Sequence, residues 1–291
     1  MSYGRAFALV MVAALLSSTN GLFVRWLGEI GDWQLVFWRH AITGSAMLAV
    51  LAAWYRRRLP GTIVRMGRIG VAGCLFFATS GILFMVALRN APVADVVAVL
   101  GAVPPLTALA ARLTLGEKVF PATWVAMVAA MAGITVMVAG SLGGANLTWV
   151  LLATGNALVV AGFATVLRWG HTIDMLPMIA LGALLAAAVS APLALADPLP
   201  DLRQFLILAV WCATITPFYY SLFVISSRRL PGGELMLSLP VEVIAASLLA
   251  WLLIGELPAT PSLIGGGIVL AAVTGLTLVR LRQQSPRNRG L

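Results

Sequence analysis

The chain consists of apolar runs of about 20 residues joined by short links, and this pattern limits the folds open to it. A helix needs about 20 apolar residues to cross the hydrocarbon core of a membrane. With 61% hydrophobic and only 10% charged residues in a chain of 291, no soluble domain fits between the runs. We therefore expect an all-α integral membrane protein with ten transmembrane helices, at residues 5–27, 33–54, 66–88, 92–115, 120–140, 148–169, 175–196, 203–227, 232–254 and 261–281.

The distribution of positive charge predicts the orientation of these spans, because cytoplasmic loops of membrane proteins are rich in Arg and Lys. If the N-terminus is inside, 15 of the 19 basic residues lie on the cytoplasmic side, and only Arg25, Arg39, Arg89 and Arg203 do not. We therefore expect both termini in the cytoplasm. The net charge of +9 is distributed between apolar runs rather than gathered on one face, so nucleic acid is not an expected partner.

An internal repeat divides the chain. Residues 91–117 align without a gap on residues 230–256, at an offset of 139. The alignment pairs Pro92 with Pro231, Asp95 with Glu234, and Gly116-Glu117 with Gly255-Glu256. We predict two halves, residues 1–142 and 143–291, each with five spans. Because five is odd, the second half is inverted relative to the first, which is the architecture of many secondary transporters with a substrate site at the midplane.

These features together resemble the drug/metabolite transporter superfamily, in its EamA-type branch. The matching residues are the two Gly-Glu helix ends, Gly116-Glu117 and Gly255-Glu256, and Arg39 within VFWRHAI early in the second span. The resemblance implies a ten-helix carrier that exports or exchanges metabolites across the bacterial inner membrane. The polar first span, SSTNGLFVRW, further resembles the branch of aromatic amino-acid exporters, although the Trp-Gly pair of most relatives is missing.

Glu242 is the most informative single residue, since it lies within the apolar segment Leu235–Glu256. A charge at the centre of a membrane helix costs about 2.5–3.5 kcal/mol on insertion scales, so such residues face the protein interior or a cavity. We expect Glu242 to contact a substrate ammonium group or relay a proton. The structural alternative is a neutral acid bonded to a backbone carbonyl that Pro240 leaves free.

Helix-weakening residues recur at the same depth in both repeats and predict a hinge. Pro240 removes a helical hydrogen bond, and Gly101 is its partner in the repeat. A static kink filled by neighbouring side chains is the alternative. The predicted gating or hinge residues are Gly101, Pro104, Pro105, Pro217 and Pro240.

The other predicted substrate contacts are polar or aromatic residues within spans. Asn20 and Asn156 lie far from span ends, whereas Ser and Thr hydroxyls often bond only to their own helix. Tyr219 and Tyr220 are deeper than an interfacial aromatic belt requires, so aromatic rings could line a cavity, with ordinary helix packing as the alternative. The full predicted set besides Glu242 is Asn20, Trp38, Ser80, Phe84, Asn156, Phe163, Tyr219, Tyr220 and Ser238.

Three further charged residues have structural alternatives. Arg39 near the outer end of its span is predicted to hold a substrate carboxylate at the mouth of the cavity, or else to snorkel to the interface or form an ion pair. Glu117 and Glu256 end helices, and we expect each to cap the N-terminus of the next segment.

Other functional classes find little support in the sequence. No HExxH, catalytic aspartate pair or nucleophile motif indicates an enzyme, no P-loop indicates ATP, and the two histidines lack metal-ligand spacing. We expect neither metal nor cofactor. The prediction is a carrier, functional as a monomer, for small metabolites, with amino acids including aromatic or apolar ones as the first choice. The alternative is export of cationic drugs or another metabolite by proton antiport.

Overall fold

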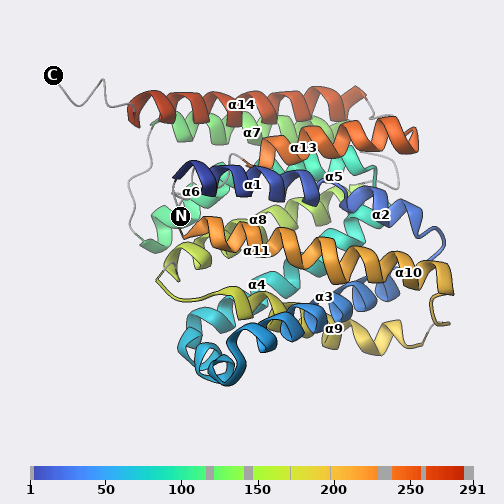
Figure 1. Cartoon of the computed structure of the whole chain (residues 1–291). Helices are drawn as coiled ribbons and strands as arrows, with labels where there is room; N and C mark the ends of the chain where they lie inside the picture. The colour runs from blue at the N-terminus through green and yellow to red at the C-terminus, as the bar shows by residue number, and fades with distance from the viewer. Residues whose placement is uncertain are drawn as a thin grey trace.

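A computed structural model describes residues 3–115, 121–140, 147–170, 172–196, 198–228, 238–256 and 260–284. These residues are almost entirely helical and contain no strand, which confirms the predicted all-α class (Figure 1). The helices are α1 (Tyr3–Ser17), α2 (Asn20–Trp26), α3 (Asp32–Tyr55), η1 (Arg56–Arg58), α4 (Leu59–Asn90), α5 (Val93–Leu100), α6 (Val103–Leu115), α7 (Pro121–Gly140), α8 (Leu147–Trp169), α9 (Leu176–Ala194), α10 (Leu202–Val210), η2 (Trp211–Ile215), α11 (Thr216–Ser227), α13 (Ser238–Leu249), η3 (Ala250–Ile254) and α14 (Thr260–Gln284).

Each of the ten predicted ranges contains helix in the part that is described, but several boundaries differ. The clearest difference is α4, which begins at Leu59 rather than at residue 66. The chain leaves the helical conformation at Arg56, where φ is +48°, enters α4 through the short turn η1, and bends again at Gly67. By length and composition, five helices are long and apolar enough to cross a membrane, and the longest of them, Asp32–Asn90, includes both α3 and α4. The number of ten spans therefore stays a prediction.

The helices lie side by side in layers (Figure 1). Helices α7 and α14 pack together at one edge, and α3 and α9 pack together at the opposite edge. Between them α4 packs on α8 and α9, while α1 packs on α11 and α13. Helix α13 of the second predicted half thus lies against α1 and α5 of the first. The two predicted halves therefore contact each other at both edges of the bundle as well as in its interior.

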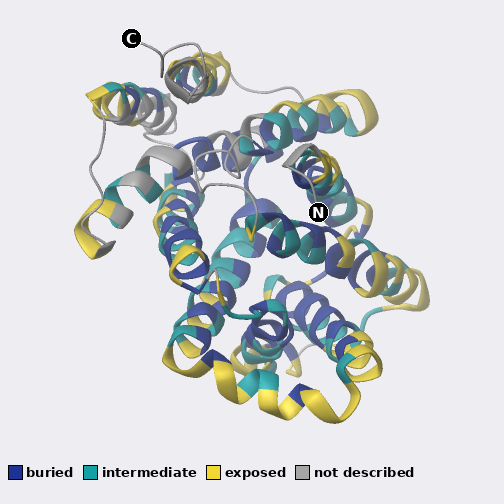
Figure 2. Cartoon of the chain, turned by 60° about the vertical axis from the view of Figure 1, so that its left-hand side comes forward, coloured by how far each residue is buried: buried dark blue, intermediate teal, exposed yellow. Residues whose placement is uncertain are grey.

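Small residues allow the helices to approach closely, as is typical where membrane helices associate by packing. On α3, a Cβ added to Gly44 would lie 2.8 Å from Cγ of Leu184 on α9. The α9 face is lined by fully buried Ala180, Ala183 and Ala186. Large apolar residues such as Leu75 and Leu253 are exposed on the outside, and Figure 2 shows exposed residues along the outer faces of the helices. This arrangement suits a protein surrounded by lipid.

Three irregular turns interrupt the inner helices. Ser18 and Thr19 separate α1 from α2, and each hydroxyl donates to a carbonyl of the preceding turn, at 2.7 Å. Gly101 and Ala102 separate α5 from α6. Residues 211–215 form a π-helical turn between α10 and α11. Such turns are frequent at functional sites, because they redirect side chains within a helix.

Candidate functional site

Polar side chains from both predicted halves meet beside the break between α1 and α2. Ser17, the last residue of α1, donates a hydrogen bond from Oγ to Oε1 of Glu242 on α13, at 2.5 Å. Asn20, the first residue of α2, donates from Nδ2 to the same Ser17 oxygen at 3.4 Å. The break therefore places two polar side chains of the first half next to the carboxylate of the second.

The contacts continue from Asn20 to the π-helical turn and to α3. Trp211 donates from Nε1 to Oδ1 of Asn20 at 3.2 Å, and the guanidinium carbon of Arg39 lies 5.1 Å from the centre of the Trp211 ring. Arg39 then donates from Nη2 to the hydroxyl of Tyr219 at 3.1 Å. We call this continuous set the polar chain: Glu242, Ser17, Asn20, Trp211, Arg39 and Tyr219.

Arg39 is the most enclosed charge of the polar chain, with only 1% of its surface exposed. Its Nη1 lies 3.3 Å from Nε2 of His40, and Nδ1 of His40 lies 2.7 Å from the carbonyl oxygen of Val36. A carbonyl oxygen accepts and a guanidinium donates. His40 must therefore carry its proton on Nδ1 and accept at Nε2, so it adds no charge to the site.

The structure also decides between the structural alternatives for Arg39. Snorkelling to the interface is wrong, because the guanidinium points inward to Trp211 and Tyr219 rather than toward the membrane surface. An ion pair is absent as well, since no carboxylate among the described residues pairs with Arg39, and its Nε has no hydrogen-bond partner there. Arg39 lies inside the bundle and not at a mouth.

An aromatic cluster adjoins the polar chain at Tyr219. The Tyr219 and Tyr220 rings are 4.4 Å apart between centroids, and Tyr220 contacts Phe77 of α4 at 4.9 Å. Phe77 in turn lies 5.8 Å from Phe163 of α8. Three of the predicted aromatic residues are thus brought together, with Phe77 as a member that the sequence analysis did not name.

Other predicted contacts lie elsewhere in the bundle. The ring neighbours of Trp38 are Phe37 and Phe205, on the α10 side of α3. Phe84 is half-buried against the main core. Ser80 is half-buried on α4, and the described contacts link it to no member of the polar chain. Ser238 is buried at the first position of α13.

Asn156 is a separate case, because it is buried on α8 with 1% of its surface exposed. Its Oδ1 has no hydrogen-bond partner among the described residues. A buried amide oxygen without a hydrogen bond costs about 1–3 kcal/mol of stability. A hydrogen-bond donor other than the described residues would therefore bind favourably at Asn156.

The predicted hinge residues lie close to the irregular turns. Gly101 forms the turn between α5 and α6, and Pro104 and Pro105 follow in the first turn of α6. Pro217 is the second residue after the π-helical turn, within the first turn of α11. Pro240 is the third residue of the described part of α13, and residues 229–237 before it lie outside the described residues, so the hinge expected at Pro240 stays a prediction.

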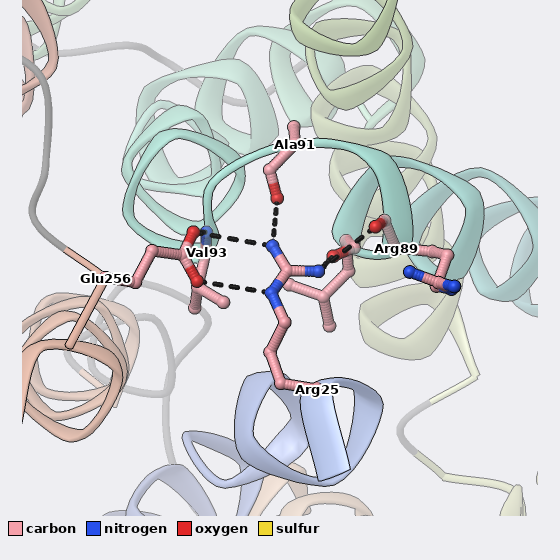
Figure 3. A network of polar contacts seen from close by, with 6 residues as sticks. Arg25, Arg89, Ala91, Val93 and Glu256 are labelled. Carbon is pink, nitrogen blue, oxygen red and sulfur yellow. Dashed lines mark hydrogen bonds and ion pairs between the residues drawn. The ribbon is translucent and has the colours of Figure 1, made fainter. Parts of the chain in front are cut away.

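A second polar cluster lies at the end of the bundle where α2 ends (Figure 3). Arg25 binds the Glu256 carboxylate through Nε to Oε2 at 3.2 Å and through Nη2 to Oε1 at 3.4 Å. The same guanidinium also donates to three backbone carbonyls where α4 meets α5, those of Leu88 and Arg89 at 3.0 Å and of Ala91 at 2.6 Å. One side chain therefore joins α2, the α4–α5 link and the end of η3.

Glu256 does cap a helix, but not the one predicted. Its Oε1 accepts from the backbone N–H of Val93, the first residue of α5, at 2.7 Å. Gly255 makes this possible, because its φ of +74° ends η3 in a left-handed turn that glycine adopts without strain. The capped helix belongs to the first predicted half, whereas the start of the segment predicted to be capped, residues 257–259, lies outside the described residues. Glu117 lies outside the described residues.

Ser17, Trp211 and Arg25 are functional candidates that the sequence analysis missed. The general rule that Ser hydroxyls bond to their own helix does not single out Ser17, but its spacing of three residues before Asn20 puts the two side chains within reach of each other on a helix. Trp211 lies well inside its span, away from the belt where most Trp residues are expected. Arg25 carried no local signal, because its partners are distant in the sequence.

Comparisons with known proteins agree with this architecture. The sequence model of the EamA-like transporter family matches the chain twice, over residues 4–139 and 147–278. No curated protein sequence gives a significant match. A solved crystal structure is similar in fold, with a TM-score of 0.70 and 20% sequence identity, over 96% of this chain and 99% of that chain. The chain therefore belongs to the EamA-like transporter family, and is a membrane transporter of small molecules rather than an enzyme.

Proposed function

We propose that the protein exports or exchanges zwitterionic metabolites, amino acids above all, by alternating access around the polar chain. In this proposal the halves 1–142 and 143–291 move against each other, and the substrate binds between them. Arg39 binds the substrate carboxylate and Glu242 binds its ammonium group. The aromatic cluster receives an apolar or aromatic side chain.

The observation that carries the proposal is the burial of the Arg39 guanidinium without a carboxylate partner among the described residues. An enclosed guanidinium without a counter-charge is strongly unfavourable in a membrane interior. Within the described residues its contacts are the Trp211 ring, Tyr219, Tyr220 and a neutral imidazole, none of which is a carboxylate, and Nε stays unpaired. A substrate carboxylate would supply the missing charge and would match the planar fork of the guanidinium.

Glu242 provides the complementary charge at the other end of the polar chain. Glu242 is half-buried on α13, so its side chain is not fully enclosed by its neighbours. A carboxylate has about four lone-pair positions, and Ser17 supplies one described donor. The lone pairs that Ser17 leaves free can accept hydrogen bonds from an ammonium group.

The alternative of a cationic drug exporter is less well supported. Glu242 alone would suit a cation, but the unpaired charge of Arg39 lies in the same polar chain and would repel it. A zwitterion carries a partner for each charge, and in this proposal Arg39 and Glu242 approach each other around the substrate as the halves move. The irregular turns beside the site support alternating access, since inverted-repeat carriers place interrupted helices around the substrate.

The experiment that tests the proposal compares three forms of one substrate by titration calorimetry. We expect the protein to bind an aromatic amino acid better than its methyl ester, which lacks the carboxylate charge, or its N-acetyl form, which lacks the ammonium charge. Arg39→Gln should remove the preference over the ester, and Glu242→Gln should remove the preference over the N-acetyl form. Equal binding of all three forms by the unaltered protein would contradict the proposal.

Replacing Arg39 by Lys tests whether geometry matters beyond charge. The ammonium group keeps the positive charge but loses the fork that binds a carboxylate through two bonds and the flat contact with Trp211. We expect affinity for the amino acid to fall by about 10-fold or more, from a loss of roughly 1.5–3 kcal/mol. Unchanged affinity would show that Arg39 does not bind the carboxylate directly.

We also propose that the protein lies in the bacterial inner membrane with both termini in the cytoplasm. The start of α1 and the end of α14 lie at the same end of the bundle (Figure 1). Arg228, Asp174 and Tyr55 meet in one hydrogen-bonded group, next to the exposed Arg56–Arg58. A reporter that works only in the cytoplasm should be active when fused after Leu291, and one that works only in the periplasm should be inactive. Activity of the periplasmic reporter would overturn this orientation.

A further inference from the structure

The link between α3 and α4 contains a surface feature that the transport site does not use. Helix α3 ends at Tyr55, the three arginines of η1 follow, and α4 starts at Leu59. The first turns of α4 are anchored on one face only, since Leu59 and Met66 are buried while Val64 and Arg65 are exposed. This short segment therefore lies on the surface of the bundle.

Gly67 redirects the chain after this segment. Its backbone, at φ +51° and ψ −144°, is outside the helical region and outside the range that other residues adopt readily. The bend separates the surface segment from the long inner part of α4. Residues from both sides of the bend, Ile63, Val64, Gly67, Arg68 and Val71, line an open groove of about 500 Å³.

The groove combines apolar walls with strong positive charge. Ile63, Val64 and Val71 form the walls, and Val64 and Val71 are 78% and 61% exposed. Arg68 lines the groove itself. Four more exposed arginines lie within twelve residues before it in the sequence, Arg56, Arg57, Arg58 and Arg65.

None of these five guanidinium groups forms an ion pair with a carboxylate within the described part of the chain. Orientation of the protein alone would require positive charge at this end, but it would require neither a bend nor a groove. Trp54, which is 82% exposed just before the arginines, is a residue typical of the membrane interface. The position thus offers an apolar surface and unpaired cations at the level of lipid headgroups.

We propose that this groove binds an anionic phospholipid. The phosphate contacts Arg65 and Arg68, which suits guanidinium geometry, and the start of an acyl chain lies along Val64 and Val71. Arg56, Arg57 and Arg58 increase the local concentration of anionic lipid. A free phosphate has no apolar part that could pack against the walls of the groove, so a phospholipid is the expected occupant.

The test uses the purified full chain in detergent, with phosphatidylglycerol and phosphatidylcholine as probes and native mass spectrometry as the readout. We expect phosphatidylglycerol to bind about 10-fold or more tightly than phosphatidylcholine. The variant R65Q/R68Q should lose most of this preference. The control variant R112Q/R203Q removes two positive charges elsewhere in the protein. It should keep the preference for phosphatidylglycerol.

A second variant and a competitor make the result decisive. Val64→Glu changes an exposed residue, so folding is preserved, and its carboxylate should repel the phosphate and weaken phosphatidylglycerol binding. Glycerol phosphate, which has the headgroup chemistry without acyl chains, should fail to compete. Equal binding of the two lipids, an unaffected R65Q/R68Q variant, or full competition by glycerol phosphate would each overturn the proposal.

Discussion

Replacing Glu242 by Gln is expected to reduce amino-acid exchange by about 100-fold or more, because it removes the charge that binds the ammonium group. Removing one partner of a buried charge pair costs about 2–5 kcal/mol, which corresponds to a factor of about 30 to several thousand. The amide has the same size as the carboxyl, and its oxygen can still accept from Ser17. Exchange of a labelled amino acid in proteoliposomes measures the effect.

Ser17→Ala is the matched control for this prediction. It removes the described donor to Glu242 but leaves the charge in place, so we expect only a several-fold loss of exchange. Full activity of Glu242→Gln would return the residue to a structural role. An equal loss in both variants would mean that the hydrogen bond matters and not the charge.

Replacing Arg25 by Ala should strongly destabilise the folded protein. The change leaves Glu256 without its cation and three backbone carbonyls without a donor, at the end of the bundle where the halves meet (Figure 3). Loss of a buried ion pair costs about 3–5 kcal/mol, and because the side chains of Arg25 and Glu256 are 22% and 19% exposed, we expect the lower end, about 3 kcal/mol. The thermal unfolding temperature should fall by about 5–10 °C.

Arg203→Ala is the control at the same end of the bundle. Arg203 is exposed and makes a single described hydrogen bond, to the carbonyl oxygen of Trp26 at 3.1 Å. Its loss should change the unfolding temperature by little. If Arg25→Ala were as stable as Arg203→Ala, the cluster around Glu256 would not hold the two halves together.

Hydrophobic patterning predicted much of the fold, because burial in lipid imposes a simple rule on every span. Residues 33–54 were predicted and α3 covers Asp32–Tyr55, while residues 203–227 were predicted and α10 to α11 cover Leu202–Ser227. Hydrophobic patterning placed the start of α4 at residue 66, whereas the helix begins at Leu59. Where the next helix begins after the arginine-rich link depends on the packing of Leu59 and Met66, which are buried and which the hydrophobic pattern alone does not place.

The members of the site were easier to predict than their partners. Glu242, Asn20 and Tyr219 stand out as polar residues within apolar runs, whatever the fold. The contacts Asn20–Trp211 and Arg39–Tyr219 join residues more than 170 positions apart, and only the arrangement of helices creates them. The π-helical turn that presents Trp211 also has no pattern in the sequence that we identified.

The repeat predicted an equivalence between helix ends but not their contacts. Gly255-Glu256 was correctly singled out as the end of a helix, and Glu256 does cap an N-terminus. A local capping rule points to the segment that follows in the chain. In the bundle, Glu256 reaches the N-terminus of α5, because α13 packs on α5.

Counterflow in proteoliposomes tests the central claim most directly. Vesicles are loaded with one unlabelled amino acid per batch, and entry of the same labelled amino acid is followed. The account predicts saturable counterflow with several amino acids, strongest for those with apolar or aromatic side chains, and its loss in Glu242→Gln and Arg39→Gln. Absence of counterflow with every amino acid, under conditions where the protein is folded and inserted, would contradict the account and favour a different class of solute.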